Sequence, residues 1–263
     1  MPAHPCQPRA EVSSLDSTIA GSLIERLRRP RIVAAIVLLS LTGGILLAFL
    51  YERGELAGAD AYAYWEGVRR WLAGADPYDP VEMHLPYVYP PWTLLLFLPW
   101  ALLPWEIAWF GWRAVNVVLF AGTVAWAYQR RPLPTALLLA VLGPALAANL
   151  DTGNVNVLIV VAIWVAQFTQ PRVGGLLWAL VTGLKWVPAP LIVLLPPRAR
   201  AWGLAFVGVA IVLTLATWPL TLHQIDVALN HPRPVRLDYM ILAWAAVPWL
   251  WRQRWRPWWL QRR

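Results

Sequence analysis

The chain has 263 residues, of which 59% are hydrophobic and only 14% are charged. Soluble domains average roughly 45–50% apolar and 25% charged residues, so this composition excludes a soluble domain, a disordered chain and an ordinary cytosolic enzyme. The net charge is +8, and the basic residues stand mostly between apolar runs. Orientation in a membrane explains that placement better than nucleic-acid binding does, so we expect membrane lipids and no nucleic acid as partners.

Residues 1–31 are polar and end in a basic cluster, which predicts a cytoplasmic N-terminal segment. The run 32–51 has 20 residues without a charge, which is enough to span the hydrocarbon core and too long for a typical signal-peptide core. We therefore expect an uncleaved anchor in a multi-pass protein of the plasma membrane, with the N-terminus in the cytoplasm.

The polar interval 52–90 is the longest one between apolar segments and is expected to form an outer loop. Within residues 60–74, four apolar side chains at i, i+4, i+7 and i+8 share one helical face: Tyr64, Val68, Trp71 and Leu72. Arg69 and Arg70 take the other side of this helix. The pattern predicts an amphipathic helix that lies on the outer leaflet.

Four apolar segments follow the outer loop. Residues 92–103 would cover only about 18 Å as a helix, which fits an interfacial or re-entrant helix better than a span. Residues 106–128 are long enough for a full span, and residues 133–149 and 155–168 form a hairpin around a polar turn.

The run 173–195 allows two interpretations. It is either one span with Lys185 at its centre, or two short helices broken at residues 185–188 with the lysine at the outer face. The broken hairpin places 15 lysines and arginines inside and five outside, whereas one straight span gives ten and ten. The positive-inside rule therefore favours the broken hairpin.

Residues 201–222 and 240–251 complete the set of apolar segments. The sequence thus predicts an all-α fold, a polytopic helical membrane bundle of about seven or eight spans over residues 32–251. The basic, tryptophan-rich tail 252–263 is expected at the cytoplasmic surface, where it would anchor on anionic lipid. These patterns leave the oligomeric state open.

Several short motifs occur in a fixed order along the chain. They are Asp60, Gly74-Ala75-Asp76-Pro77-Tyr78, Tyr87-Val88-Tyr89-Pro90-Pro91, Pro99, Pro104, Trp112, Asn116, Gly153-Asn154-Val155-Asn156 and Leu184-Lys185-Trp186-Val187-Pro188. In order and spacing, these motifs resemble glycosyltransferase family 87, whose members are polyprenol-phosphate-sugar-dependent enzymes of the GT-C superfamily. The last two motifs resemble its Gly-Gln-x-Asn and Leu-Lys-x-x-Pro elements. Asn154 stands where the family usually has glutamine, and the chain is shorter than such enzymes commonly are.

The resemblance implies a GT-C-like bundle that moves a hexose, with mannose as first choice, from a polyprenyl-phosphate donor to a lipid or cell-envelope acceptor at the outer face. Phosphate is a good leaving group, so one carboxylate can suffice as general base for the acceptor hydroxyl, whereas glycosidases generally use two. The superfamily places its essential acid in the first outer loop, a position that Asp60 matches. Glu66, Asp76 and Asp79 are lesser candidates, and an N-cap role is the structural alternative for Asp60.

The superfamily's habit also implies inversion at the anomeric carbon, and we expect a reaction without metal or other cofactor. The sequence agrees with the latter expectation, because Cys6 is the only cysteine and the four histidines show no ligand spacing.

Lys185 is the only lysine of the chain and stands in an apolar run. An ammonium in a membrane costs on the order of 3 kcal/mol, so we expect it to stabilise the leaving phosphate, with snorkelling to the outer interface as the alternative. Arg113 lies inside a span and is a second candidate for binding the donor. Its structural alternative is an ion pair with Asp151 or Glu106.

The remaining substrate-binding candidates stand at the outer edge of the membrane. They are Tyr89, Asp151, Asn156, Asp76 and Tyr78. Asp151 and Asn156 could orient a sugar or hold Lys185, or else cap helices, and for Asn154 we favour the capping interpretation. Tyr89 precedes two prolines and could form a wall under the donor phosphate, whereas Asp76 is expected to be a turn residue.

Two other functions remain possible at this point. The early end of the chain suggests a shortened, non-catalytic relative that binds a lipid-linked sugar or joins a membrane complex. The helix break at Lys185 would suit a small transporter. Against a transporter, no matched repeat halves are visible, and most of the polar chemistry stands in an outer loop.

Overall fold

The computed structural model describes residues 30–52, 57–79, 85–230 and 237–251. The predictions for residues 1–29 and for the tail 252–263 fall outside these ranges. In chain order the helices are α2 (Pro30–Glu52), α3 (Ala59–Leu72), η2 (Pro91–Thr93), α4 (Leu94–Ala101), α5 (Trp105–Arg130), α6 (Pro132–Thr152), α7 (Asn156–Ala166), α8 (Pro171–Leu184), η3 (Ala189–Leu194), α9 (Pro197–Ala216), α10 (Trp218–Asn230), η4 (Leu237–Ala246) and α11 (Val247–Leu250). The described residues contain no strand, so the predicted all-α class is confirmed for them.

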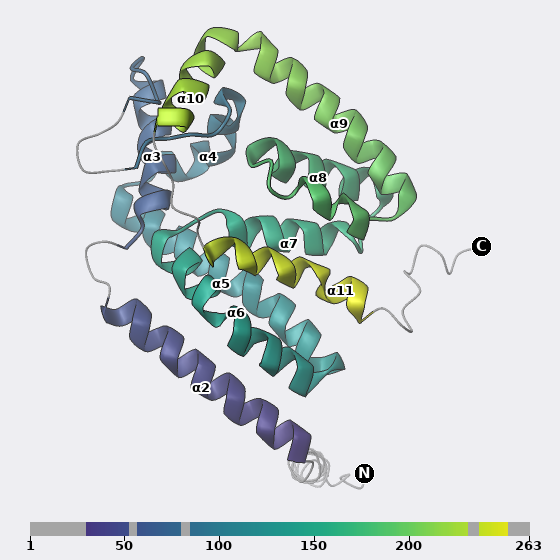
Figure 1. Cartoon of the computed structure of the whole chain (residues 1–263). Coiled ribbons are helices and arrows are strands. Elements are labelled where there is room, and N and C mark those ends of the chain that lie inside the picture. The colour runs from purple at the N-terminus through teal and green to yellow at the C-terminus, as the bar shows by residue number, and fades with distance from the viewer. Residues whose placement is uncertain (1–29, 53–56, 80–84, 231–236, 252–263) are drawn as a thin grey trace, which may run out of the picture.

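Helix α7 forms the centre of the bundle. Eight of its 11 residues are buried, and it contacts α5, α6, α8 and η4. A helix that is apolar around its whole circumference has to be covered on all sides, which explains the central position. Helices α2 and α6 lie on one side of α7, and α8 and α9 lie on the other side (Figure 1).

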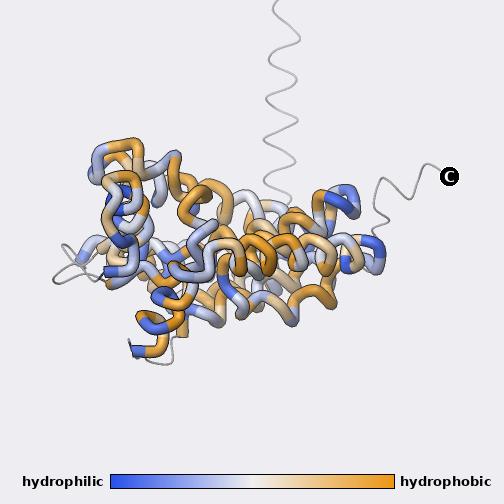
Figure 2. Tube along the Cα trace, turned by 90° about the horizontal axis from the view of Figure 1, so that it is seen from above, coloured by the Kyte–Doolittle hydropathy of each residue, from blue (hydrophilic) through white to orange (hydrophobic). Residues whose placement is uncertain are grey.

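Four helices are long and apolar enough to cross a membrane, namely α2, α5, α6 and α9. On α2 the side chains of Leu41, Ile45 and Leu47 are 60%, 69% and 71% exposed, a degree of apolar exposure that requires an apolar surrounding. Hydrophilic segments gather mainly toward opposite ends of the molecule (Figure 2). The chain is therefore a helical membrane protein, whereas the number of crossings stays a prediction, because α4, α7 and the η4–α11 unit are shorter apolar helices.

The apolar run 173–195 is broken at the lysine, as the distribution of positive charge predicts. Helix α8 ends at Leu184, and Lys185 leaves it in an extended conformation with φ −148° and ψ 115°. The chain then turns back through the short 3₁₀ helix η3. Pro188 and Pro190 lack the amide hydrogens that a continued α-helix would use, so the break is built into the sequence.

Because the chain turns back between them, α8 and α9 run parallel to one another. A Cβ atom at Gly175 would lie 2.6 Å from Gly203 N, and one at Gly183 would lie 3.4 Å from Ala210 Cβ, so contacts advance along both helices together. Glycines at such a crossing let two backbones approach closely, a common device in membrane helices.

The structure corrects the predicted span 201–222. Helix α9 ends at Ala216, and a separate helix, α10, begins at Trp218. Thr217 takes a non-helical conformation between them, with φ −106° and ψ 32°. Pro219 follows at the second position of α10, where its missing amide hydrogen is tolerated, and this explains why the helix restarts there.

The structure also corrects the predicted lipid-facing side of the loop helix. Helix α3 forms where the sequence predicts it, but Tyr64 and Val68 are buried inside the protein. The ring of Tyr64 stacks on Phe97 of α4, with ring centroids 4.7 Å apart. Trp71 and Leu72 are exposed, so only the end of this apolar face is available to a membrane surface.

We predict that Gly175→Ala lowers the thermal unfolding temperature in detergent, because its methyl group would collide with the backbone of α9. Overpacking of this kind costs roughly 1–3 kcal/mol. Gly208→Ala on α9 is the matched control, since a Cβ atom there meets nothing within 4 Å, and we expect it to be neutral or slightly stabilising. Equal unfolding temperatures for the two variants would contradict the parallel packing of α8 and α9.

Candidate active site

Helix α3 is attached to the end of α6 by its first residues. Gly58, which precedes the helix with φ 89°, donates its N–H to the carbonyl of Asp151 at 2.7 Å. Asp60 follows in the first turn, so Gly58 and not Asp60 occupies the N-cap position. The capping alternative for Asp60 is therefore wrong, and the carboxylate is available for other contacts.

The turn between α6 and α7 comes into close contact with this first turn of α3. Gly153 in that turn has φ 70°, and a Cβ atom there would lie 2.6 Å from Ala61 Cβ and 2.7 Å from Trp109 Cζ3. The indole of Trp112 donates to the Gly153 carbonyl at 2.8 Å. Only glycine combines this left-handed backbone with so close an approach, and the contact brings Asp60 beside the turn.

A chain of hydrogen bonds joins two acids through two asparagines and one lysine. Asn154 Nδ2 donates to Asp60 Oδ2 at 2.9 Å, and Lys185 Nζ donates to Asn154 Oδ1 at 3.3 Å. Lys185 Nζ also donates to Asn156 Oδ1 at 2.9 Å, and Asn156 Nδ2 donates to Asp238 Oδ2 at 3.3 Å. We call these five residues the polar network. The ammonium thus lies between two amide oxygens, and a carboxylate lies beyond each amide.

All five side chains of the polar network are buried. Lys185 is 7% exposed, and Asp60 and Asp238 are each 6% exposed. Buried charges are costly unless they are paired and hydrogen-bonded, so the network explains how the protein tolerates an ammonium here. The Lys185 ammonium also lies over the ring of Tyr239, 4.6 Å from the centroid. Its snorkelling to the outer interface is therefore wrong.

Asn154 has a larger role than the sequence indicates. Its Oδ1 accepts the backbone N–H of Asn156 at 3.1 Å, which is a capping contact at the start of α7. The same side chain bridges Asp60 and Lys185. The interpretation of Asn154 as a helix cap alone is therefore wrong.

Asp238 is the member of the network that the sequence interpretation missed. It lies in the first turn of η4, and its carbonyl accepts a bond from Asn149 Nδ2 at 2.9 Å. One sequence signal could have found it, because Asp238 is an acid that stands directly at the start of an apolar run.

The other two ionisable candidates lie beside this network. Asp151 is 1% exposed at the end of α6, where its carbonyl holds Gly58 and thereby the first turn of α3. Arg113 is half-buried, with its guanidinium carbon 5.1 Å from the ring centroid of Trp109. Among the described residues, the stabilising partner found for Arg113 is this indole ring, so the structure gives no support to the alternative of an ion pair with Asp151 or Glu106.

Tyrosines of the outer loop pack one helical turn away from Asp60. Tyr64 and Tyr89 share a hydrogen bond between their hydroxyls at 3.1 Å, and the Tyr78 hydroxyl donates to the Tyr89 carbonyl at 2.9 Å. Burial raises the pKa of Tyr78, and the neighbouring Asp76 carboxylate raises it further. The phenol therefore stays protonated and can keep donating to the Tyr89 carbonyl, which holds this part of the outer loop in place.

Asp76 is a turn residue, as the sequence predicts, and it also has a distant partner. Its Oδ1 accepts the backbone N–H of Tyr78 at 2.9 Å, and its Oδ2 lies 2.7 Å from His223 Nδ1 of α10. Asp79 pairs with Arg70 at 3.2 Å. The ligand atoms of Asp76, Asp79 and His223 lie within 4.8 Å of one another, a metal-compatible grouping that sequence spacing could not reveal.

Comparisons with known proteins identify the family of this chain. The model of glycosyltransferase family 87 matches residues 87–230, more than half of the chain. The chain is 26% identical over 194 residues to the polyprenol-phosphate-mannose-dependent alpha-(1-2)-phosphatidylinositol pentamannoside mannosyltransferase of Mycolicibacterium smegmatis, covering 68% of this chain and 47% of that protein. It is 29% identical over 235 residues to the polyprenol-phosphate-mannose-dependent alpha-(1-2)-phosphatidylinositol mannoside mannosyltransferase of Mycobacterium tuberculosis, covering 72% and 55%.

The chain therefore spans about half the length of the curated relatives it matches. No solved structure matches it significantly. Lys185, Asn154 and Asn156 lie inside the region that the family model matches, whereas Asp60 and Asp238 lie outside it.

We predict that Gly153→Ala destabilises the protein more than Gly74→Ala does. Both glycines have positive φ, of 70° and 76°, so alanine costs roughly 1–2 kcal/mol of backbone strain at either position. A Cβ atom at Gly74 meets nothing within 4 Å, whereas one at Gly153 collides with Ala61 and Trp109. Thermal unfolding in detergent measures the difference, and equal shifts for the two variants would contradict the contact between α3 and the α6–α7 turn.

Proposed function

Because the chain belongs to glycosyltransferase family 87, we propose that it transfers a sugar from a polyprenyl-phosphate donor to an acceptor at the outer face of the membrane. The observation that carries the proposal is the polar network, in which a carboxylate and an ammonium are connected through one asparagine. The curated relatives are named for polyprenol-phosphate-mannose and for phosphatidylinositol mannosides. We propose mannose as the sugar and a lipid as the acceptor.

In this proposal Asp60 is the general base. The acceptor hydroxyl attacks the anomeric carbon of the donor sugar, and the bond from that carbon to the phosphate oxygen breaks. The hydroxyl proton passes to Asp60, and polyprenyl phosphate leaves with the bonding electrons. Phosphate needs little protonation to leave, so one carboxylate is sufficient, and attack from the opposite side inverts the anomeric carbon.

Lys185 would stabilise the negative charge on the leaving phosphate. A preorganised cation in a water-poor site contributes more than the same charge in water, because it needs no reorientation during the reaction. The amide oxygens of Asn154 and Asn156 fix the direction of the ammonium. Asp238 acts one step further away as a positioning residue, since it holds the Asn156 amide group.

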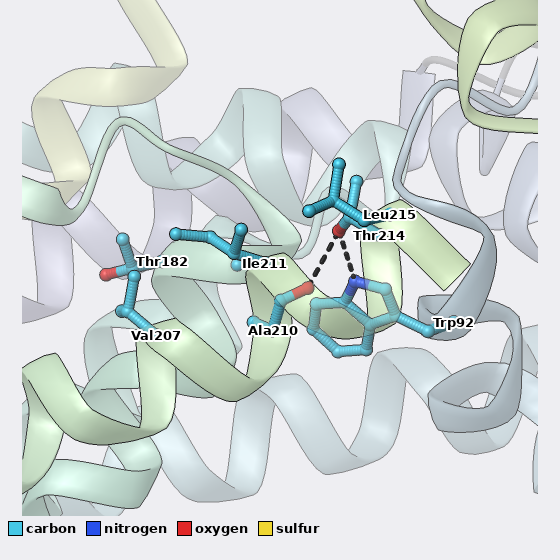
Figure 3. Close-up of a pocket in the computed structure, with 8 residues that line it drawn as sticks. Trp92, Thr182, Val207, Ala210, Ile211, Thr214 and Leu215 are labelled. Carbon is cyan, nitrogen blue, oxygen red and sulfur yellow. Dashed lines mark hydrogen bonds between the residues drawn. The ribbon is translucent and has the colours of Figure 1, made fainter. Parts of the chain in front are cut away.

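An apolar cavity at the end of α8 suits the isoprenoid part of the donor. It has a volume of about 250 Å³ and is lined by the end of α8, the second half of α9 and Trp92. Figure 3 shows Trp92 at one end of this cavity, where its indole nitrogen donates to Thr214 Oγ1 at 3.2 Å. Gly183 of the lining stands two residues before Lys185, so a phosphate at the ammonium would place its hydrocarbon chain here.

We propose that the chain is a multi-pass protein of the plasma membrane with its N-terminus in the cytoplasm and residues 32–251 as one transmembrane domain. The support is the distribution of positive charge. The α5–α6 and α7–α8 junctions and the start of α9 lie toward the same end of the bundle as the start of α2 (Figure 1). These junctions carry Arg130, Arg131, Arg172, Arg198 and Arg200, as the positive-inside rule requires of a cytoplasmic side.

We predict that Asp60→Asn abolishes mannose transfer while leaving the protein folded. A positioned general base contributes roughly 10²–10⁴-fold to the rate, and the amide cannot accept the proton. The measurement is transfer from polyprenyl-phosphate mannose in vesicles, with Asp226→Asn on the exposed side of α10 as the control. Normal turnover by Asp60→Asn would remove Asp60 from this role. Donor binding without transfer by the unaltered chain would favour a binding protein over an enzyme.

We predict that Lys185→Gln lowers transfer by roughly 10²–10³-fold, the range found when one charge-stabilising donor is removed from an active site. Glutamine keeps polar hydrogens near Asn154 and Asn156 but loses the positive charge. Binding of polyprenyl phosphate to the purified protein should weaken in parallel, because the phosphate loses its cation. Unchanged binding of polyprenyl phosphate would place the donor phosphate elsewhere.

A further inference from the structure

The side chain of Asn154 touches both groups that the proposed reaction uses. Its Nδ2 donates to Asp60 Oδ2 at 2.9 Å, and its Oδ1 accepts from Lys185 Nζ at 3.3 Å. The carboxylate and the ammonium thus stand at opposite ends of one carboxamide, which is itself buried, with 2% of the residue exposed. The amide therefore occupies a contact with the ammonium that a donor phosphate needs, and a contact with the carboxylate that an acceptor hydroxyl can use.

The start of α7 fixes which end of this amide faces which group. Asn154 Oδ1 also accepts the backbone N–H of Asn156 at 3.1 Å. A backbone N–H and an ammonium can only donate hydrogen bonds, so the atom that meets both of them has to be the oxygen. The amide nitrogen, which can only donate, is left to face Asp60. The direction of the amide is therefore set by three contacts, of which Lys185 supplies one.

The Lys185 ammonium is buried against three described side chains. Asn154 and Asn156 accept its hydrogen bonds, and the ring of Tyr239 lies 4.6 Å away. Because the lysine is only 7% exposed, a phosphate oxygen has to replace one of the present contacts. In the proposed reaction the anomeric carbon lies between the leaving phosphate and the base, so the phosphate has to reach the ammonium from the side of Asp60. Asn154 stands on that side.

Charge favours the exchange of Asn154 for a phosphate. Hydrogen bonds that involve charged groups are roughly twice as strong as those between neutral groups, and a phosphate adds a second charge to the contact, whereas the amide oxygen is neutral. The contact of Lys185 with Asn154 is also the longer one, at 3.3 Å against 2.9 Å for Asn156. An acceptor hydroxyl has no comparable advantage at Asp60, because the hydroxyl and the amide are both neutral donors. The donor can therefore displace Asn154 more readily than the acceptor can.

A phosphate at the ammonium would also draw the amide away from the carboxylate. Ionised phosphate and carboxylate only accept hydrogen bonds, and Asn154 has a single donating end. With a phosphate beside Oδ1, two accepting oxygens would face one another, so the amide has to turn and present Nδ2 to the phosphate. Asp60 Oδ2 then loses its amide partner and becomes available to an acceptor hydroxyl.

We propose that Asn154 couples the two substrates, so that the donor binds first and releases Asp60 for the acceptor. This inference rests on the proposed function, because it takes Asp60 as the base and Lys185 as the ligand of the donor phosphate. Asn154 is then a positioning residue that holds both groups until the phosphate arrives. Coupling between two ligands typically changes the affinity for the second by roughly 5–150-fold, and the factor is the same in both directions.

The first test follows Asp60 with dicyclohexylcarbodiimide, which reacts with protonated carboxyl groups in apolar surroundings. The full chain in phosphatidylcholine vesicles is treated with and without polyprenyl phosphate, which carries no sugar to transfer, and the labelled peptides are identified by mass spectrometry. We expect polyprenyl phosphate to raise the labelling of Asp60 about fivefold or more, because the carboxyl group loses its amide donor. Unchanged or lower labelling would overturn the proposal. So would an equal rise with phosphatidylglycerol, which would identify a general effect of anionic lipid.

Two alanine variants separate Asn154 from its neighbour in the network. In Asn154→Ala we expect labelling of Asp60 to be high with or without polyprenyl phosphate, since no amide remains to be displaced. Asn156→Ala is the matched control, because Asn156 holds the same ammonium but donates to Asp238 and not to Asp60, so the rise should persist. A rise in Asn154→Ala, or its loss in Asn156→Ala, would overturn the proposal. If a variant does not fold, the response of the unaltered chain decides.

Steady-state transfer separates this inference from the proposed function. With polyprenyl-phosphate mannose as donor and a mannosylated phosphatidylinositol as acceptor, we expect the acceptor KM to fall about fivefold or more as the donor concentration rises from well below to well above its own KM. In Asn154→Ala the acceptor KM should not depend on the donor. Active, unaltered protein whose acceptor KM ignores the donor would overturn the coupling and leave the proposed function intact. Absence of transfer would contradict the proposed function, and the carbodiimide labelling would still decide whether a phosphate releases Asp60.

Discussion

The structure depends on one buried ammonium and the contacts that hold it. Lys185 lies between the side-chain oxygens of Asn154 and Asn156, and each asparagine donates in turn to an acid. A buried charge is costly unless it is paired or hydrogen-bonded, so the ammonium needs these contacts to be tolerated inside the protein. Helix α3, the α6–α7 turn, the end of α8 and the start of η4 therefore have to meet at this point.

The network keeps the Asp60 carboxylate and the Lys185 ammonium in one site without direct contact between them. Direct contact would prevent each group from meeting another partner. A lysine in a direct ion pair with Asp60 would hold the carboxylate in its charged form and occupy its oxygens. Asn154 stands between them and keeps both groups in one site without joining them directly. In the function that we propose, a base and an anion-binding cation can then act on two different substrates.

The features that the sequence predicts correctly are those that depend on residues close together in the chain. The break at Lys185 was predictable because prolines end helices and positive charge prefers the cytoplasmic side. Sequence reasoning failed where a contact depends on segments far apart in the chain. The capping interpretation of Asn154 describes its local turn correctly, but its bond to Asp60 crosses 94 residues. The burial of Tyr64 and Val68 likewise depends on the packing of α4 and the outer loop against α3.

The sequence by itself determined that the chain is an all-helical membrane protein, that the run 173–195 breaks at Lys185, and that this lysine is costly enough to need a function or a partner. Hydropathy, helix periodicity and the loss of an amide at proline act between near neighbours, so they can be read along the chain. Only the tertiary structure decided that Asp60, Lys185 and Asp238 belong to one network. Hydrogen bonds require atoms about 3 Å apart, and the contact of Gly153 with Ala61 and Trp109 brings Asp60 to the network.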